Sequence, residues 1–286
     1  MPEPDGKLPD SRLAQEPAVQ HLVVRYAKRG KMRFASHRDV ARAFERGVRR
    51  AGLPIAYSAG FSPHPKISYA GGAPTGVASE AEYLSISLTA RQVEEQVCQR
   101  LDAVLPDGID VIDVTDEKGP GGLVPPAAGG SGGPAGSPPR ANATFSHLEA
   151  SQWRVVLPGV GSAAAEQAVA SFLALGEAPV ERRTDKGVRV LDARAAVVEM
   201  NVVTLDGITA DPEGGQRAAV TGHEDCAILR MVVLHTAPAV RPEDILTALR
   251  ERNDIVPSSP PLTTRLAQGS RTLLTGKTPL TGASGS

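Results

Sequence analysis

The sequence predicts an α+β protein made of two tandem ferredoxin-like (βαββαβ) units joined by a Gly/Pro-rich linker. Three observations support this prediction. The length of 286 residues suggests two domains of ordinary size. Strand and helix periodicities follow the order β-α-β-β-α-β in the first half and recur more faintly in the second. Between the halves, residues 117–148 are rich in Gly, Pro and Ala without apolar periodicity, which predicts a flexible linker.

The first unit is expected over residues 19–116, after a disordered tail at residues 1–18. Ser36 and Asp39 have capping-box spacing at the start of a helix that ends at Ala51, before Gly52 and Pro54. Thr89 and Gln92 have the same spacing, which predicts that a second helix begins at Thr89. Strands are expected over residues 20–27, 54–57, 66–70, 83–88 and 109–114.

The second unit is expected over residues 149–256, and residues 257–286 are expected to form a disordered tail. Ser162 should cap a helix that runs to Leu175, and Pro242 should be the first residue of the last helix. Residues 207–224 have the composition of a polar insertion. The remaining elements are expected to be a strand over 152–157, a hairpin of 180–183 with 188–191, and valine-rich or long strands over 195–205 and 226–236.

Charge is distributed unevenly along the chain. Residues 21–66 carry eleven Lys and Arg against Asp39 and Glu45, a net charge of +9, whereas the rest of the chain carries −10 of the total of −1. A solvated helix face tolerates such a run, but a net charge this high over 46 residues favours a polyanionic partner.

The helix over residues 36–51 has two unlike faces. At 100° per residue, Val40, Phe44 and Val48 fall on an apolar face together with Ala41, Gly47 and Ala51. The opposite face carries Arg38, Arg42, Arg46 and Arg49, with only Glu45 near them. These four arginines are called the arginine stripe below, and with Lys31 and Arg33 they are the predicted phosphate contacts.

The loop over residues 58–66 is restricted by Gly60, Pro63 and Pro65. One interpretation is an ordered turn with a packed Phe61 and a hydrogen-bonded His64. The other is that Phe61, His64 and Lys66 meet a base or ribose, because rigid loops with such side chains commonly serve a ligand. Tyr57, just before the loop, is expected to orient it.

The stretch SHRDVARAFERGVRRAGLP, followed by GFSPHPK, resembles the bacterial radical-SAM-linked protein family, domain of unknown function 2344, in its stand-alone form. The resemblance is specific over this stretch and can be followed loosely to about Arg265. It implies an association with RNA-related or radical-SAM chemistry and does not imply a particular reaction.

A radical-SAM cluster needs three closely spaced cysteine ligands, and this chain has only Cys98 and Cys226, far apart in sequence. We therefore expect no cofactor. Any cluster would belong to a separate radical-SAM enzyme acting as a partner.

Two acid–base groups provide a catalytic alternative. With His37 accepting a proton, His64 donating one and Lys66 or Arg42 holding a phosphate, the chain would be a metal-independent RNA endonuclease. The simpler interpretation of His37 is a helix-terminal histidine bonded to the adjacent loop.

The segment Ser79-Glu-Ala-Glu-Tyr83 carries two carboxylates two residues apart at the start of a strand. We expect Glu80 and Glu82 to pair with Arg33 or Arg38 and, with Ser79, to orient the site. The alternative is a metal site formed with His64, although no metal is the preferred expectation.

The sequence therefore predicts an RNA-binding accessory module for tRNA or rRNA that works with a separate modifying or processing enzyme. The alternatives are a metal-independent RNA endonuclease that uses the two histidines and a protein-interaction domain whose basic face docks an acidic partner such as the radical-SAM enzyme. The N-terminus lacks a basic and apolar leader, and no apolar run reaches the roughly 18 residues of a membrane span, so we expect a cytoplasmic protein without membrane contact.

Overall fold

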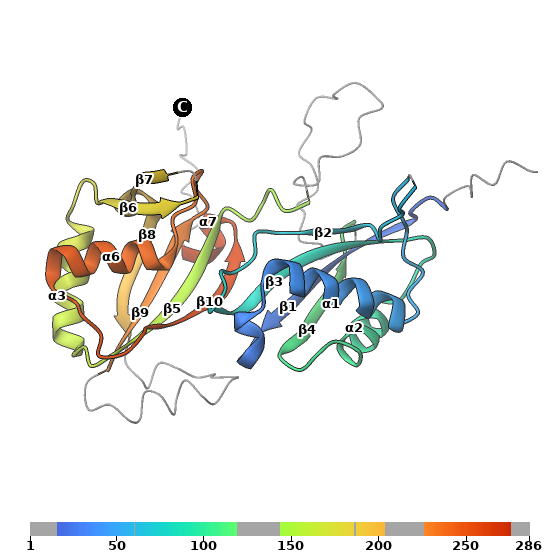
Figure 1. Ribbon diagram of the computed structural model, residues 1–286, viewed down its shortest axis with the longest axis horizontal. Coiled ribbons are helices and arrows are strands. Elements are labelled where there is room, and N and C mark those ends of the chain that lie inside the picture. Colours follow the sequence, from blue (N-terminus) through green and yellow to red (C-terminus); the bar gives the residue numbers. More distant parts are fainter. Residues whose placement is uncertain (1–15, 60, 119–143, 186, 204–225, 276–286) are drawn as a thin grey trace, which may run out of the picture.

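A single sheet runs through both halves of the chain in the computed structural model, which describes residues 16–59, 61–118, 144–185, 187–203 and 226–275. Its strands follow the order β4-β1-β3-β10-β5-β9-β8, and β2 pairs with β3 beside this path (Figure 1). The fold is mixed α/β with a mostly sheet core. Most of the predicted N-terminal tail and linker, and the predicted insertion at 207–224, lie outside the described residues.

The first half contributes the strands β4, β1, β3 and β2, and every neighbouring pair among them is antiparallel. The helices α1 and α2 pack on one face of these strands, over a core that includes Leu22, Phe44 and Leu101. The elements are β1 (Gln20–Lys28), η1 (Gly30–Phe34), α1 (His37–Arg50), β2 (Ile67–Tyr69), β3 (Ala78–Leu88), α2 (Glu94–Asp102) and β4 (Ile109–Asp116).

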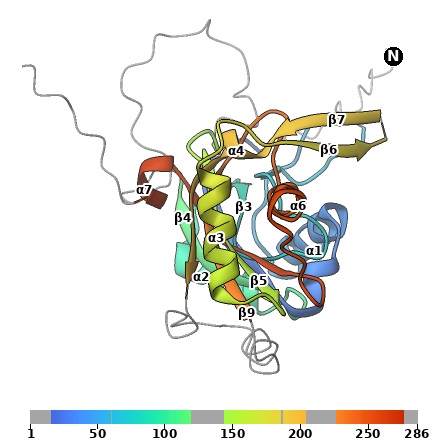
Figure 2. The same cartoon turned by 90° about the vertical axis from the view of Figure 1, so that its left-hand side faces the viewer.

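The second half repeats this arrangement with β10, β5, β9 and β8, again antiparallel at each step. The predicted hairpin is confirmed, but it forms a separate two-stranded sheet that projects from the main one (Figure 2). The elements are β5 (Ala150–Pro158), α3 (Ser162–Leu173), β6 (Pro179–Thr184), β7 (Gly187–Asp192), α4 (Ala193–Ala196), β8 (Val197–Val203), β9 (Cys226–Leu234), α6 (Pro242–Asn253), β10 (Leu262–Gly269) and α7 (Arg271–Thr275).

The prediction of a disordered tail over residues 257–286 is wrong for the part that the structure describes, because β10 lies in the middle of the sheet and α7 follows it. It pairs antiparallel with β5 and, through Thr264 and Arg265, parallel with β3. Its buried side chains are polar, so the strand lacks the apolar alternation that identifies strands in a sequence. These buried residues are Thr263, Thr264, Arg265 and Gln268.

Two further boundaries differ from the predictions. The last residues of the predicted linker are ordered, because Phe145 and Leu148 pack against Val23 and Tyr83. The second helix begins at Glu94 rather than at Thr89. Thr89 Oγ1 donates to the Pro54 carbonyl, so this stretch is tied to the connection after α1 before the second helix starts.

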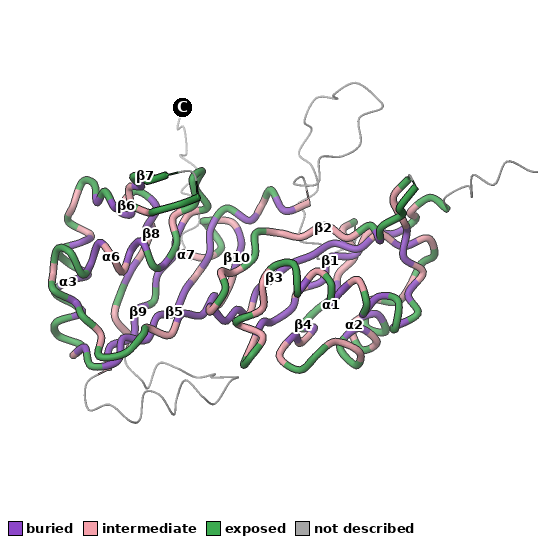
Figure 3. Tube along the Cα trace, viewed as in Figure 1, coloured by how far each residue is buried: buried purple, intermediate pink, exposed green. Residues whose placement is uncertain are grey.

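The helices α1 and α2 of the first half and α3 and α6 of the second cover the same face of the sheet. Trp153 of β5 belongs to the core under α3 and α6. Leu84 of β3 belongs to the core under α1 and α2, and Glu82, two residues before it, lies on the same face of that strand. Arg265 of β10 contacts both Trp153 and Glu82. Because β10 pairs with β3 of the first half and with β5 of the second, the halves share one continuous sheet, and buried residues lie along its strands in both halves (Figure 3).

Candidate functional site

The start of α1 is fixed by the predicted capping box. Ser36 Oγ accepts from the Asp39 backbone N–H, and the Asp39 carboxylate accepts from the Ser36 backbone N–H at 3.1 Å and from its hydroxyl at 2.6 Å. These bonds to Ser36 lower the pKa of Asp39. Both residues therefore orient the helix from which the arginine stripe projects.

The apolar face of α1 packs on the sheet as predicted. Val40, Phe44 and Val48 are buried, and Ala43 joins them, whereas the predicted Ala41 is half-buried. A β-carbon on Gly47 would lie 3.1 Å from Leu105 Cδ2, so a glycine allows α1 to lie close against the segment after α2. The opposite face of the helix consequently points to solvent.

Every member of the arginine stripe is exposed. Within the described part of the chain, none of the four forms an ion pair. Glu45 is half-buried, and its charge contributes to the raised pKa of Tyr69, for which burial is the larger cause. The stripe therefore presents cationic side chains to solvent without an ion-paired carboxylate among the described residues, although the Arg42 charge is a minor cause of the lowered pKa of Asp39.

The predicted phosphate contacts Lys31 and Arg33 lie on η1, before α1, and differ from each other. Lys31 is exposed. Arg33 is half-buried: its Nε donates to the Gly76 carbonyl at 2.8 Å, and its guanidinium lies 5.8 Å from the Phe34 ring centroid. Arg33 thus holds the 71–77 loop. Phe34, which the sequence interpretation missed, is 66% exposed.

The loop over residues 58–66 is anchored at its base. Ser58 N–H donates to the His64 carbonyl at 2.8 Å, His64 N–H donates to Ser58 Oγ at 3.0 Å, and Tyr57 pairs with Pro65 in an isolated bridge. Phe61 does not pack, because its side chain is fully exposed. The alternative of a packed Phe61 is therefore wrong.

His37 and His64 do not meet. His37, at the first position of α1, is in edge contact with Tyr69, whereas Lys66 N–H donates to Ala56, in the connection that follows the other end of the helix. Tyr69 pairs with Leu84 on β3. At about 1.5 Å per residue, the length of α1 separates the two histidines by roughly 20 Å. A shared acid–base site would need them within hydrogen-bond reach of one substrate.

The carboxylates of the Ser79–Tyr83 segment do not pair with Arg33 or Arg38. Glu80 forms an ion pair with Arg29, which also pairs with Asp110 at 2.8 Å. Glu82 pairs with Arg265 at 3.0 Å. A register shift between β1 and β3 in this stretch breaks the regular alternation, so the two carboxylates serve different partners. Neither of these ion pairs includes His64, so the described contacts do not bring together the three residues of the metal alternative.

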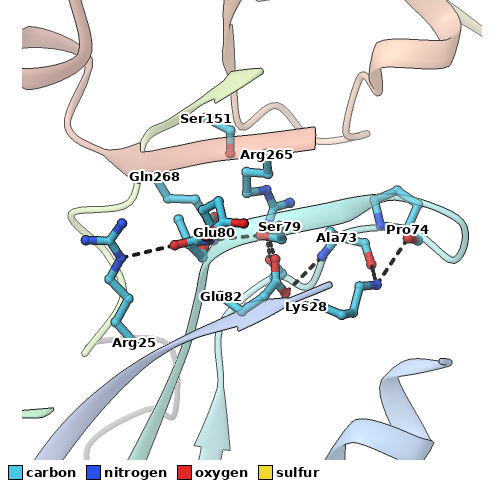
Figure 4. A network of polar contacts seen from close by, with 12 residues as sticks. Arg25, Lys28, Ala73, Pro74, Ser79, Glu80, Glu82, Ser151, Arg265 and Gln268 are labelled. Carbon is cyan, nitrogen blue, oxygen red and sulfur yellow. Dashed lines mark hydrogen bonds and ion pairs between the residues drawn. The ribbon is translucent and has the colours of Figure 1, made fainter. Parts of the chain in front are cut away.

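Glu82 lies in a buried polar network between the halves (Figure 4). Its second oxygen accepts from Ala73 N–H at 3.1 Å, while Arg265 Nη1 also donates to the Gly71 carbonyl at 2.9 Å. Lys28 Nζ donates to the carbonyls of Ala73 and Pro74 at 3.1 and 3.3 Å. Charged side chains from β1, β3 and β10 therefore hold the 71–74 loop in place.

Burial is the largest cause of the pKa shifts of Tyr26, Lys28 and Arg265. It lowers the pKa of Lys28 and that of Arg265, against the opposing effect of the Glu82 charge, and it raises the pKa of Tyr26. The Ser79 side chain is fully buried, and its Oγ accepts from Ala81 N–H at 3.3 Å, so Ser79 supports the local turn of the strand and is closed to solvent.

Comparison with known proteins assigns this chain a family. The model of the family described as "Uncharacterized protein conserved in bacteria (DUF2344)" matches residues 21–242. No curated protein matches the chain. None of the helices in the described ranges has the length and apolar character to cross a membrane.

Proposed function

The chain belongs to the DUF2344 family of uncharacterised bacterial proteins, and we propose that it is an RNA-binding accessory module. The proposed ligand is tRNA or rRNA. The module would work with a separate modifying or processing enzyme, and the motif resemblance suggests a radical-SAM enzyme for that role.

The observation that carries the proposal is the arginine stripe. Side chains three or four residues apart on a helix are neighbours, about 5–6 Å apart at their β-carbons. Arg38, Arg42, Arg46 and Arg49 follow this spacing, are all exposed, and lack an ion-pair partner among the described residues. A row of such groups suits the successive phosphates of one strand.

Exposed aromatic side chains at the two ends of the stripe support a single-stranded ligand. Phe34 lies before α1, with the Arg33 guanidinium near its ring, and Phe61 projects from the loop beyond the other end. Proteins that bind single strands combine a cationic track with aromatic platforms for the bases. We assign base or ribose contacts to Phe34, Phe61, His64 and Lys66.

We also infer that each half is a ferredoxin-like unit. The strand orders β4-β1-β3-β2 and β10-β5-β9-β8 are the same when each half is numbered separately, and both are antiparallel throughout. This order supports a split βαβ arrangement. The β6–β7 hairpin is then an insertion, and β10 completes the second unit.

Binding without strand cleavage is the form of the proposal that the geometry favours. The nuclease alternative places a proton acceptor at His37 and a donor at His64, and these lie at opposite ends of α1. The remaining alternative is an acidic protein docked on the stripe. It requires the same arginines, so only a binding experiment distinguishes it from RNA binding.

Direct binding to single-stranded RNA tests the proposal. The change is Arg42→Gln with Arg49→Gln, and the control is Arg183→Gln with Arg189→Gln, two exposed arginines of the hairpin that change the net charge equally. Each lost phosphate contact removes about 0.7 from the log–log salt slope, so two losses weaken binding roughly 25-fold at about 0.1 M salt. Fluorescence anisotropy of a labelled oligonucleotide measures this effect.

The control variant should bind as the unmodified protein does. No binding by the unmodified protein, or equal loss in both variants, would contradict the proposal. Retained affinity of the stripe variant for RNA would instead direct attention to an acidic protein partner.

A further inference from the structure

A groove of about 360 Å³ lies where the two halves meet, between the 71–74 loop and the N-terminal end of α6. Trp153, Val240 and Pro242 contribute apolar wall, and this volume lies within the range of small-ligand sites, which form preferentially between domains. The polar side chains that line it are Ser151, His235, Arg241 and Arg265.

The charges of this groove favour an anion. Two arginines line it, and no Asp or Glu is among its lining residues. Arg241 is exposed, whereas Arg265 is 5% exposed. Arg265 Nη1 donates to the Glu82 carboxylate and to the Gly71 carbonyl, while the buried Nε has no hydrogen-bond partner among the described residues. A buried donor without a partner is costly, so a ligand oxygen that reaches the Arg265 guanidinium would be bound favourably.

The groove adjoins the start of the arginine stripe. Gly72 lines the groove, and a β-carbon on it would lie 3.3 Å from His37 Cδ2, at the first position of α1. Arg38, the first member of the stripe, is the next residue. A strand that tracks the stripe therefore reaches the groove at the N-terminal end of α1.

We propose that this groove holds one nucleotide of the bound RNA, with its phosphate at Arg241 and Arg265 and its ring against Val240 and Pro242. The assignment rests on the proposed function, because the stripe identifies the ligand as RNA. A free nucleotide would be recognised by the same groups, so the experiment must distinguish a free nucleotide from a nucleotide of bound RNA.

Trp153 makes the test specific, because it is the single tryptophan of the sequence and lies in the groove wall with Arg265 4.8 Å from its ring centroid. Uridine monophosphate titrated into the full chain should change the tryptophan fluorescence in a saturable way. Uridine, which lacks the phosphate, should bind at least tenfold more weakly, and so should inorganic phosphate, which lacks the ring.

Arg241→Gln should weaken binding of uridine monophosphate about tenfold or more, since a charge-assisted contact is lost at an exposed position that leaves the fold intact. Arg252→Gln is the matched control. It removes the same charge from an exposed position in the last turn of the same helix, away from the groove, and should leave the affinity unchanged.

Several outcomes would overturn the inference: no saturable signal in fluorescence and no heat in calorimetry, equal binding of uridine, equal binding of phosphate alone, or equal effects of the two variants. The stripe variant Arg42→Gln/Arg49→Gln should retain uridine monophosphate binding. RNA binding without any response of Trp153 refutes only the groove. A Trp153 response to the mononucleotide without RNA binding refutes the proposed function and identifies a free nucleotide as the source.

Discussion

The arginine stripe on α1 and the Glu82–Arg265 pair between the halves use the same kind of side chain in opposite ways. The stripe arginines are exposed and have no ion-pair partner among the described residues. Arg265 is buried, with a carboxylate, a backbone carbonyl and an indole ring around it. An exposed arginine without a partner can be replaced without disturbing the core, whereas the buried Arg265 is part of the contact that joins the halves.

This difference predicts that the two regions respond oppositely to the loss of one arginine. Removing a stripe arginine takes away a solvated charge and leaves the core intact. Removing Arg265 leaves the buried Glu82 carboxylate without its ion-pair partner, and breaking a buried pair in this way is strongly destabilising. Contact with successive phosphates of the RNA strand is therefore assigned to the stripe, whereas the joint between the halves depends on Arg265.

The largest expected effect is that of Arg265→Met. This change should lower the free energy of unfolding by about 3–5 kcal/mol in urea denaturation. The double variant Arg265→Met/Glu82→Gln should recover most of the loss, because no unpaired charge remains. A loss below about 1 kcal/mol, or no recovery in the double variant, would show that the pair does not hold the halves together.

The sequence predicts the exposed stripe better than the buried pair, because the stripe depends on local patterns and the pair does not. The capping box of Ser36 and Asp39 and the two faces of α1 are local patterns, so they were predicted correctly. Glu82 and Arg265 lie 183 residues apart, and no periodicity links them. The polar side chains of β10 hid a central strand, so the sequence placed Arg265 in a tail.

An intermediate effect is expected at Arg29, which pairs with Glu80 and Asp110 while its side chain is 25% exposed. Partly solvated ion pairs contribute little, so Arg29→Gln should lower the free energy of unfolding by about 1 kcal/mol. Chemical denaturation measures it, with Arg50→Gln as an exposed control from the end of α1. A loss as large as that for Arg265→Met would show that burial does not separate the two ion pairs.

A smaller effect is expected from acidification. Burial lowers the pKa of His147 and that of His235. The two ring nitrogens of His235 form hydrogen bonds with Ser151 Oγ and with the Leu148 carbonyl, both at 2.7 Å. A base with a lowered pKa binds fewer protons in the folded than in the unfolded state. Its contribution to stability is full above the unfolded value of 6.5 and is lost as the pH falls below it.

The free energy of unfolding, measured by denaturation between about pH 7.5 and pH 5, should therefore decrease towards acid. His235→Gln should reduce that decrease. A steeper decrease in the variant, or a stability that rises towards acid, would be inconsistent with a neutral His235 in the folded protein.

The salt dependence of RNA binding counts phosphate contacts independently of stability, so it decides whether the stripe binds RNA. Arg42→Gln/Arg49→Gln should flatten the slope of log affinity against log salt by about 1.4 on single-stranded RNA. The exposed control Arg183→Gln/Arg189→Gln should leave the slope unchanged. A folded stripe variant with the unmodified slope and affinity would contradict the assignment of RNA binding to α1.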